Sequence, residues 1–146
     1  MSIKNTEKME RGQSMLEFAV GVVLLLVLVA GIVDLGRMFF AYIAMRDAAQ
    51  EGVVYGIVEP KQCQKIVERA VSVLNDPQGI QVGASINGKS CASATISDAC
   101  SGKGLLVTVT NPDFSISMPF LGTILGRQSI RLEAKVSGTI LRPQCP

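Results

Sequence analysis

The chain has 146 residues, which is enough for one folded domain beside a membrane anchor, and its formal net charge is +2. It contains no histidine, so it lacks the most common general base and the most common zinc ligand. No long block of one charge sign is present, and nothing in the composition indicates nucleic-acid binding. We therefore expect no enzyme, no cofactor and no metal site.

Residues 1–12 form a short polar arm with three basic residues, Lys4, Lys8 and Arg11, whose charge is partly offset by Glu7 and Glu10. By the positive-inside rule, this arm stays in the cytoplasm and the rest of the chain lies outside. The arm also resembles the start of a secretory signal peptide. Glu17, however, lies where the apolar part of a signal peptide would begin, and no small-x-small cleavage site follows the apolar residues. The apolar segment is therefore expected to stay in the protein.

An uninterrupted apolar run extends from Phe18 to Val33, and no proline occurs before Pro60. A single segment in lipid satisfies its backbone hydrogen bonds only as a helix. We predict one helix over residues 13–58, whose first half spans the membrane. Small and apolar residues recur at helical spacing between Ala41 and Gly56 and predict a face that packs on the folded domain, with a subunit interface as the alternative.

The segment around Gly12 contains the most specific motif. Arg11 and Gly12 are followed by four residues, then by Glu17 and the apolar helix. This pattern resembles the cleavage signature of type IV prepilins. The resemblance implies that a prepilin peptidase cuts between Gly12 and Gln13, which would make residues 1–12 a leader peptide and Glu17 the fifth residue of the mature chain.

Three further pieces narrow the resemblance. They are the opening R-G-x-x-x-x-E-F-A, the step formed by Asp34, Gly36 and Arg37, and the closing A-A-x-E-G-x-x-Y-G of residues 48–56. Together they resemble TadE and TadE-like pseudopilins of the tight-adherence, or Flp pilus, system. The resemblance implies a minor pilin with a pilin-like, lollipop-shaped fold. It also implies four partners: the peptidase, other pilins, the short Flp pilin and an inner-membrane platform driven by an ATPase.

Glu17 needs a counter-charge, because a carboxylate near hydrocarbon costs a few kcal/mol unless it is paired. Nothing basic lies three or four residues after it. Cleavage after Gly12 would create an amine at Gln13, in the same chain or in a neighbour. The resemblance implies that this pairing sets the stagger of packed helices. Two alternatives remain: a Glu17 solvated among lipid headgroups, and a Gln13 that cyclises and loses its amine.

Asp34 and Arg37 are spaced i, i+3 and so share one face of the predicted helix. We expect them to form an ion pair at the outer membrane interface. A proton relay is the alternative.

Residues 61–146 are predicted to form an extracytoplasmic α+β domain. We expect a short amphipathic helix over 63–75 and a hairpin of strands 80–86 and 90–96 around Asn87-Gly88. Further strands are expected at 105–110, at 114–118 after an interruption at Pro112, and at 129–141. The apolar segment 119–126 is interpreted as buried over the sheet, with an exposed partner contact as the alternative.

All four cysteines follow the apolar helix, and none forms a C-x-x-C pair. An even number on one side of an anchor predicts two disulfides in an oxidising compartment, with four free thiols as the alternative. Of the three possible pairings, we favour Cys91–Cys100 with Cys63–Cys145.

These observations favour a single-pass protein of the inner membrane that works as a minor pilin and reaches the pilus after assembly. It would act as a homo- or hetero-oligomer through its helix. An uncut, anchored extracytoplasmic binding module is the alternative function.

Overall fold

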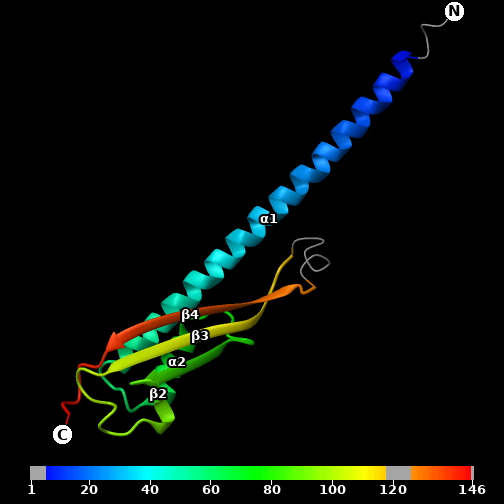
Figure 1. Ribbon diagram of the computed structural model, residues 1–146. Coiled ribbons are helices and arrows are strands. Elements are labelled where there is room, and N and C mark those ends of the chain that lie inside the picture. Colours follow the sequence, from blue (N-terminus) through cyan, green and yellow to red (C-terminus); the bar gives the residue numbers. More distant parts are fainter. Residues whose placement is uncertain (1–5, 118–125, 146) are drawn as a thin grey trace, which may run out of the picture. The chain divides into compact units, whose positions relative to one another are not determined.

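The structure, a computed structural model, describes residues 6–117 and 126–145 (Figure 1). The chain divides into two compact units. One comprises residues 1–37 and 116–128, and the other comprises residues 38–115 and 129–146. The predicted α+β class is confirmed, since a long apolar helix is followed by a short helix and a four-stranded antiparallel sheet.

Helix α1 extends over Thr6–Gly56 and has 51 residues. It begins before the predicted residue 13, because the residues around Gly12 include no proline to stop it. It ends at Gly56 and not at residue 58. After Gly56 the chain turns, and the backbone N–H of Glu59 donates to the carbonyl oxygen of Tyr55 at 3.1 Å before Pro60 follows.

The second unit contains α2 (Cys63–Ser72), β1 (Gln81–Ile86), β2 (Lys89–Ser90), the 3-10 turn η1 (Cys91–Ser93), β3 (Gly104–Ser115) and β4 (Ser129–Thr139). The strands are ordered β2-β1-β3-β4, and all neighbours are antiparallel. The predicted hairpin turn at Asn87-Gly88 is present. Both residues have positive φ, as a two-residue hairpin loop requires, and Ile86 pairs with Lys89.

Two strand predictions were wrong in detail. Of the strand expected over 90–96, only Ser90 lies in a strand, the two-residue β2, because the chain turns at Cys91 toward its disulfide partner in α2. The break expected at Pro112 is a bulge inside the continuous strand β3. Pro112 and Asp113 together lie opposite one residue of β4, so the proline does not need the N–H that it lacks.

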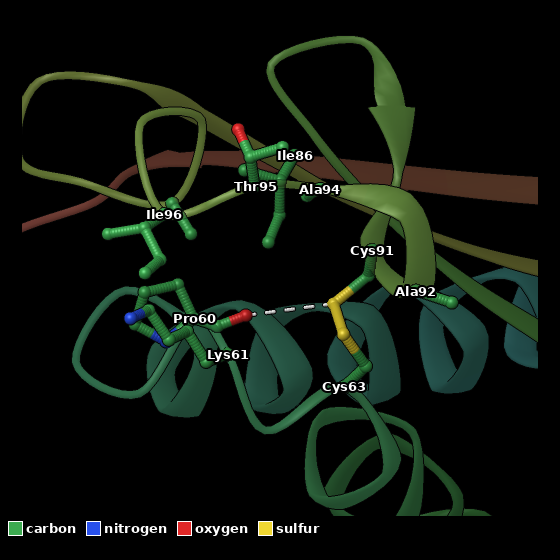
Figure 2. Close-up of a pocket in the computed structure, with 10 residues that line it drawn as sticks. Pro60, Lys61, Cys63, Ile86, Cys91, Ala92, Ala94, Thr95 and Ile96 are labelled. Atoms are coloured by element: carbon green, nitrogen blue, oxygen red, sulfur yellow. Dashed lines mark hydrogen bonds between the residues drawn. A yellow bond between two sulfur atoms is a disulfide. The ribbon is translucent and has the colours of Figure 1, made fainter.

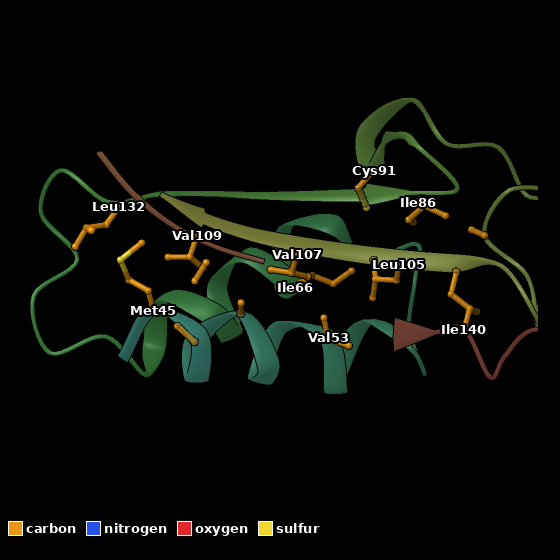
Figure 3. Packing of buried hydrophobic residues seen from close by; sticks show 14 residues of the cluster. Met45, Val53, Ile66, Ile86, Cys91, Leu105, Val107, Val109, Leu132 and Ile140 are labelled. Carbon is orange, nitrogen blue, oxygen red and sulfur yellow. The ribbon is translucent and has the colours of Figure 1, made fainter. Parts of the chain in front are cut away.

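One face of the sheet packs on α1 and α2 and forms the core (Figure 3). Figure 3 shows Met45 and Val53 of α1 pointing toward Leu105, Val107 and Val109 of β3. All five side chains are buried. The predicted small-residue face of α1 is therefore the face that packs on the sheet. The opposite face of β4 carries the charged residues Arg131, Glu133 and Lys135, which protect an edge strand from pairing with other chains.

Two glycines allow the elements of the core to approach closely. A Cβ on Gly138 of β4 would lie 2.6 Å from Cγ1 of Val53, and a Cβ on Gly56 would lie 2.5 Å from Cδ2 of Leu105. Neither methyl group would fit without movement of buried neighbours. The sequence analysis did not identify Gly138, because its neighbour in α1 is far away in the sequence. The prediction for residues 119–126 falls outside the described residues, except for Gly126.

Candidate functional site: the membrane helix and its first turns

The N-terminal part of α1 has an apolar surface that the described part of the chain does not cover. Large apolar side chains are exposed at Met15, Leu16, Phe18, Val20, Val22, Val23, Leu24, Leu25, Leu26, Leu28, Val29, Ile32, Val33 and Leu35. A water-soluble surface does not carry so many exposed apolar side chains in sequence, so this surface needs lipid or other apolar helices. Among the described residues, α1 over Gln13–Gly56 is the one helix that is long and apolar enough to cross a membrane.

The predicted cleavage and pairing residues lie at the start of this surface. Gly12 and Gln13 are inside α1, and the side chains of Gln13 and Glu17 are exposed. Residues four apart lie on one face of a helix and are separated by about 6 Å along its axis. The helix therefore places Gln13 and Glu17 on the same face, about one turn apart.

Asp34 and Arg37 form the ion pair expected from their spacing, with Nη1 of Arg37 3.3 Å from Oδ1 of Asp34. Nη1 of Arg37 also donates to the hydroxyl of Ser117, which lies after β3. Asp34 is only 9% exposed. The ion pair ends the apolar run of α1. Through Arg37 it also holds Ser117, in the connection that follows β3, against the helix within the same unit.

All four cysteines form disulfides, but the favoured pairing was wrong. Cys63 is joined to Cys91, and Cys100 is joined to Cys145, with Cα–Cα distances of 5.8 and 4.9 Å. The short turn after β2 brings Cys91 to the first residue of α2. Cys100 instead lies beside the end of the chain, where the N–H of Ser101 donates to the carbonyl oxygen of Pro143 at 2.7 Å. The preference for a short Cys91–Cys100 loop failed because it ignored these contacts.

The sequence analysis also missed Asp98, which is the most heavily hydrogen-bonded acid in the described chain. Its carboxylate accepts hydrogen bonds from Nζ of Lys89 at 2.8 Å, from the hydroxyl and N–H of Thr95 at 2.7 and 3.1 Å, and from Asn87 at 3.3 Å. These donors, Lys89 first, hold the pKa of Asp98 well below its ordinary value, although burial opposes them. The T-x-x-D spacing of Thr95 and Asp98 is a capping-type pattern that would have revealed the contact.

Asp98 lies between the two disulfides and connects the turn around Asn87 to the loop that carries Cys100. Through these hydrogen bonds, Asp98 stabilises the arrangement of the turn and the loop. In the described residues, no group of three or more metal-ligating side chains occurs.

Comparison with known families gives one match. Residues 12–54 match the model of the TadE family, whose description is TadE-like protein. The chain carries a TadE-like domain. The match begins at Gly12 and ends two residues before the end of α1, so it covers the helix and none of the strands. No curated protein and no solved structure matches the chain.

The match over residues 12–54 supports a TadE-like protein of the tight-adherence system, and the family suggests an association with the Tad pilus. TadE-like pilus proteins are structural proteins. Together with the exposed apolar surface of α1, the family indicates a single-pass membrane anchor at the N-terminal end of the chain.

Proposed function

We propose that this TadE-like protein is a minor pilin or pseudopilin of the Flp pilus. A prepilin peptidase cuts its precursor between Gly12 and Gln13, and the mature protein assembles through α1. The observation that carries this proposal is that three features occur together near Gly12. The TadE-like match begins at Gly12, the exposed apolar surface follows at once, and Glu17 stands at its edge.

The helix continues across the proposed cut site, so the peptidase must first unwind it. Within the described residues, the helical turns from Thr6 to Gly12 precede this bond. Terminal turns fray easily, and glycine lowers helix stability by about 1 kcal/mol relative to alanine. Gly12 therefore makes the helix easier to unwind at this bond, and its lack of a side chain makes the bond easier for a protease to approach.

Cleavage changes the electrostatic surroundings of Glu17. In the precursor Glu17 lies inside a long helix, whereas after the cut it lies one turn from a new helix N-terminus. The free N–H groups and the positive amine at that end favour a nearby carboxylate. We propose that the amine of Gln13, in the same or a neighbouring chain, pairs with Glu17 and fixes the axial position of one helix against the next.

Two glycines of α1 support packing against other helices. A Cβ at Gly21 or Gly36 would meet nothing within 4 Å. Both glycines lower the stability of the helix, and no contact among the described residues requires a glycine at either position. Glycine permits close approach of a neighbouring membrane helix. We propose that related pilins pack here, with the N-terminal arm in the cytoplasm and the disulfide-bonded domain outside.

Processing is tested by comparing Gly12→Leu with Gly21→Leu, because both changes add the same side chain to the same helix. The size of the protein is followed by immunoblotting in pilus-producing cells with and without the prepilin peptidase. We expect the wild type and Gly21→Leu to be shortened only when the peptidase is present, and Gly12→Leu to stay at full length. A wild type of unchanged size, or a shortened Gly12→Leu, contradicts the proposal.

The alternative function is an uncut, anchored binding module. It is favoured by the continuity of α1 through Gly12, which gives an intact anchor from Thr6 onward. The same immunoblot separates the two functions, since the anchored module keeps its full length in cells that contain the peptidase.

A further inference from the structure

A hollow of about 290 Å³ lies beside the Cys63–Cys91 disulfide (Figure 2). Figure 2 shows Thr95, Ile96 and Ile86 on one side of it, and Pro60, Lys61 and the disulfide on the other. Ile86 is buried and forms part of the wall, whereas Ile96 is 59% exposed at the rim. The hollow therefore offers an apolar wall to an incoming group, and Lys61 is its one charged lining residue.

A second hollow of about 260 Å³ adjoins the first, because both are lined by Pro60 and Lys61. Its other lining residues are Val58, Glu59, Arg142 and Pro143. Leu141 is next to it, since the N–H of Leu141 donates to the carbonyl oxygen of Ile57 at 2.8 Å. Val58 and Leu141 are both exposed. We call the two hollows and these neighbours the Pro60 surface.

The charged side chains of the Pro60 surface are mainly basic, and the basic ones have no ionic partner among the described residues. In the described residues, neither Lys61 nor Arg142 forms an ion pair or a side-chain hydrogen bond. Glu59 is the one acid that lines either hollow, and its carboxylate accepts a hydrogen bond from Gln62 at 3.1 Å. The nearby Asp98 is buried and already forms an ion pair with Lys89. A ligand with negative charge would complement this surface.

The size and shape of the hollows indicate what kind of ligand fits. Pockets for cofactors and drug-sized molecules usually begin at about 300 Å³, so each hollow is suited to one large side chain of a peptide. A concave site beside exposed apolar residues also fits a protruding side chain better than the surface of a bilayer. Interfaces commonly seat apolar anchors in such hollows and surround them with charges.

We propose that the Pro60 surface binds a short acidic segment of a partner protein. A large apolar side chain of that segment enters the hollow beside the Cys63–Cys91 disulfide, and its carboxylates pair with Lys61 and Arg142. This contact uses only residues of the folded domain. It therefore goes beyond the proposed pilin function and does not depend on cleavage after Gly12.

The test uses the full-length protein in phosphatidylcholine nanodiscs and a phage library of random octapeptides. We expect selection to enrich peptides that combine aspartate or glutamate with a large apolar residue. Their affinity should fall about fivefold or more in the Lys61→Gln, Arg142→Gln double variant, as expected for two exposed ion pairs. It should also fall in Ile96→Ser and decrease with salt.

Arg46→Gln is the matched control, because Arg46 is an exposed cation of α1 that lines neither hollow. It should bind the selected peptides like the wild type. The three altered residues of the Pro60 surface are exposed, so equal melting temperatures should show that the variants fold. No enrichment over empty nanodiscs, enrichment of basic peptides, or unchanged binding by the double variant would overturn the proposal. Binding to phosphatidylglycerol vesicles in place of the peptides would also overturn it.

Discussion

Asp98 is a single residue that joins the turn at Asn87 and Lys89 to the loop at Thr95 by hydrogen bonds. Its donors hold its pKa below the ordinary value of 3.8, with Lys89 as the largest cause. A carboxylate with a lowered folded-state pKa adds stability at neutral pH, and that stability is lost as the pH falls below about 4. Asp98→Asn should therefore melt well below the wild type at pH 7, and the difference should shrink toward pH 3.

Thermal melting followed by circular dichroism at pH 7, 5 and 3 measures this effect. Asp47→Asn is the control, since Asp47 is an exposed acid of α1, and it should change the melting temperature little at any of these values. A constant difference between Asp98→Asn and the wild type across the pH range would show that the ionised carboxylate is not what stabilises the loop.

Gly138 is a residue whose lack of a side chain permits the contact between β4 and α1. In Gly138→Ala the added methyl group would press on Val53, a stiff and buried side chain. We expect a loss of about 1–3 kcal/mol in the free energy of unfolding, measured by denaturant titration. Gly83→Ala on β1 has open space and should change stability by less than about 1 kcal/mol. Equal effects of the two changes would contradict the proposed close contact.

Glu17 tests the pairing proposed for the mature N-terminus. Glu17→Gln keeps the size of the side chain and removes its charge, so insertion and cleavage should continue. If a charged hydrogen bond to an amine is lost, the amount recovered in sheared pili should fall about tenfold. Quantitative immunoblotting of pili and membranes measures this ratio. Wild-type incorporation of Glu17→Gln would mean that Glu17 is merely solvated at the membrane surface.

At the scale of elements, the two disulfides fasten different parts of the domain. Cys63–Cys91 closes a loop of 28 residues between α2 and η1, and Cys100–Cys145 closes one of 45 residues at the chain end. Removal of either pair by serine substitution should cost about 3–4 kcal/mol of unfolding free energy by the chain-entropy estimate. Peptide mapping without reductant should find these two linkages, and a Cys91–Cys100 peptide would contradict the structure.

The elements differ in how far they could be predicted. An uninterrupted apolar run without proline indicated α1. Hydrophobic periodicity indicated α2, β1 and β4 because each buries one face, and Asn87-Gly88 indicated the turn between β1 and β2. The shortness of β2 and the bulge at Pro112 could not be predicted, because both follow from contacts made after folding: the disulfide of Cys91 and the pairing of β3 with β4. Local patterns also could not identify the disulfide partners or the Pro60 surface, since these depend on distant segments.

At the scale of the whole molecule, α1 has two kinds of surface that serve different purposes. Toward its C-terminal end, its small residues pack under the sheet, and the domain depends on them. Toward its N-terminal end, its apolar side chains are exposed. The TadE-like match, over residues 12–54, includes both surfaces. The motif around Gly12 was recognisable from the sequence because its residues, Arg11, Gly12 and Glu17, lie close together along the chain. The structure adds that the proposed cut lies in the first turns of a helix.

The proposed pilin function is tested most directly by the intact mass of the native protein isolated from pili. We predict a chain that begins at Gln13, with residues 1–12 absent. A further loss of one ammonia would show that Gln13 has cyclised, which would remove the amine proposed to pair with Glu17. A pilus-associated protein that still carries Met1 to Gly12 would contradict the account.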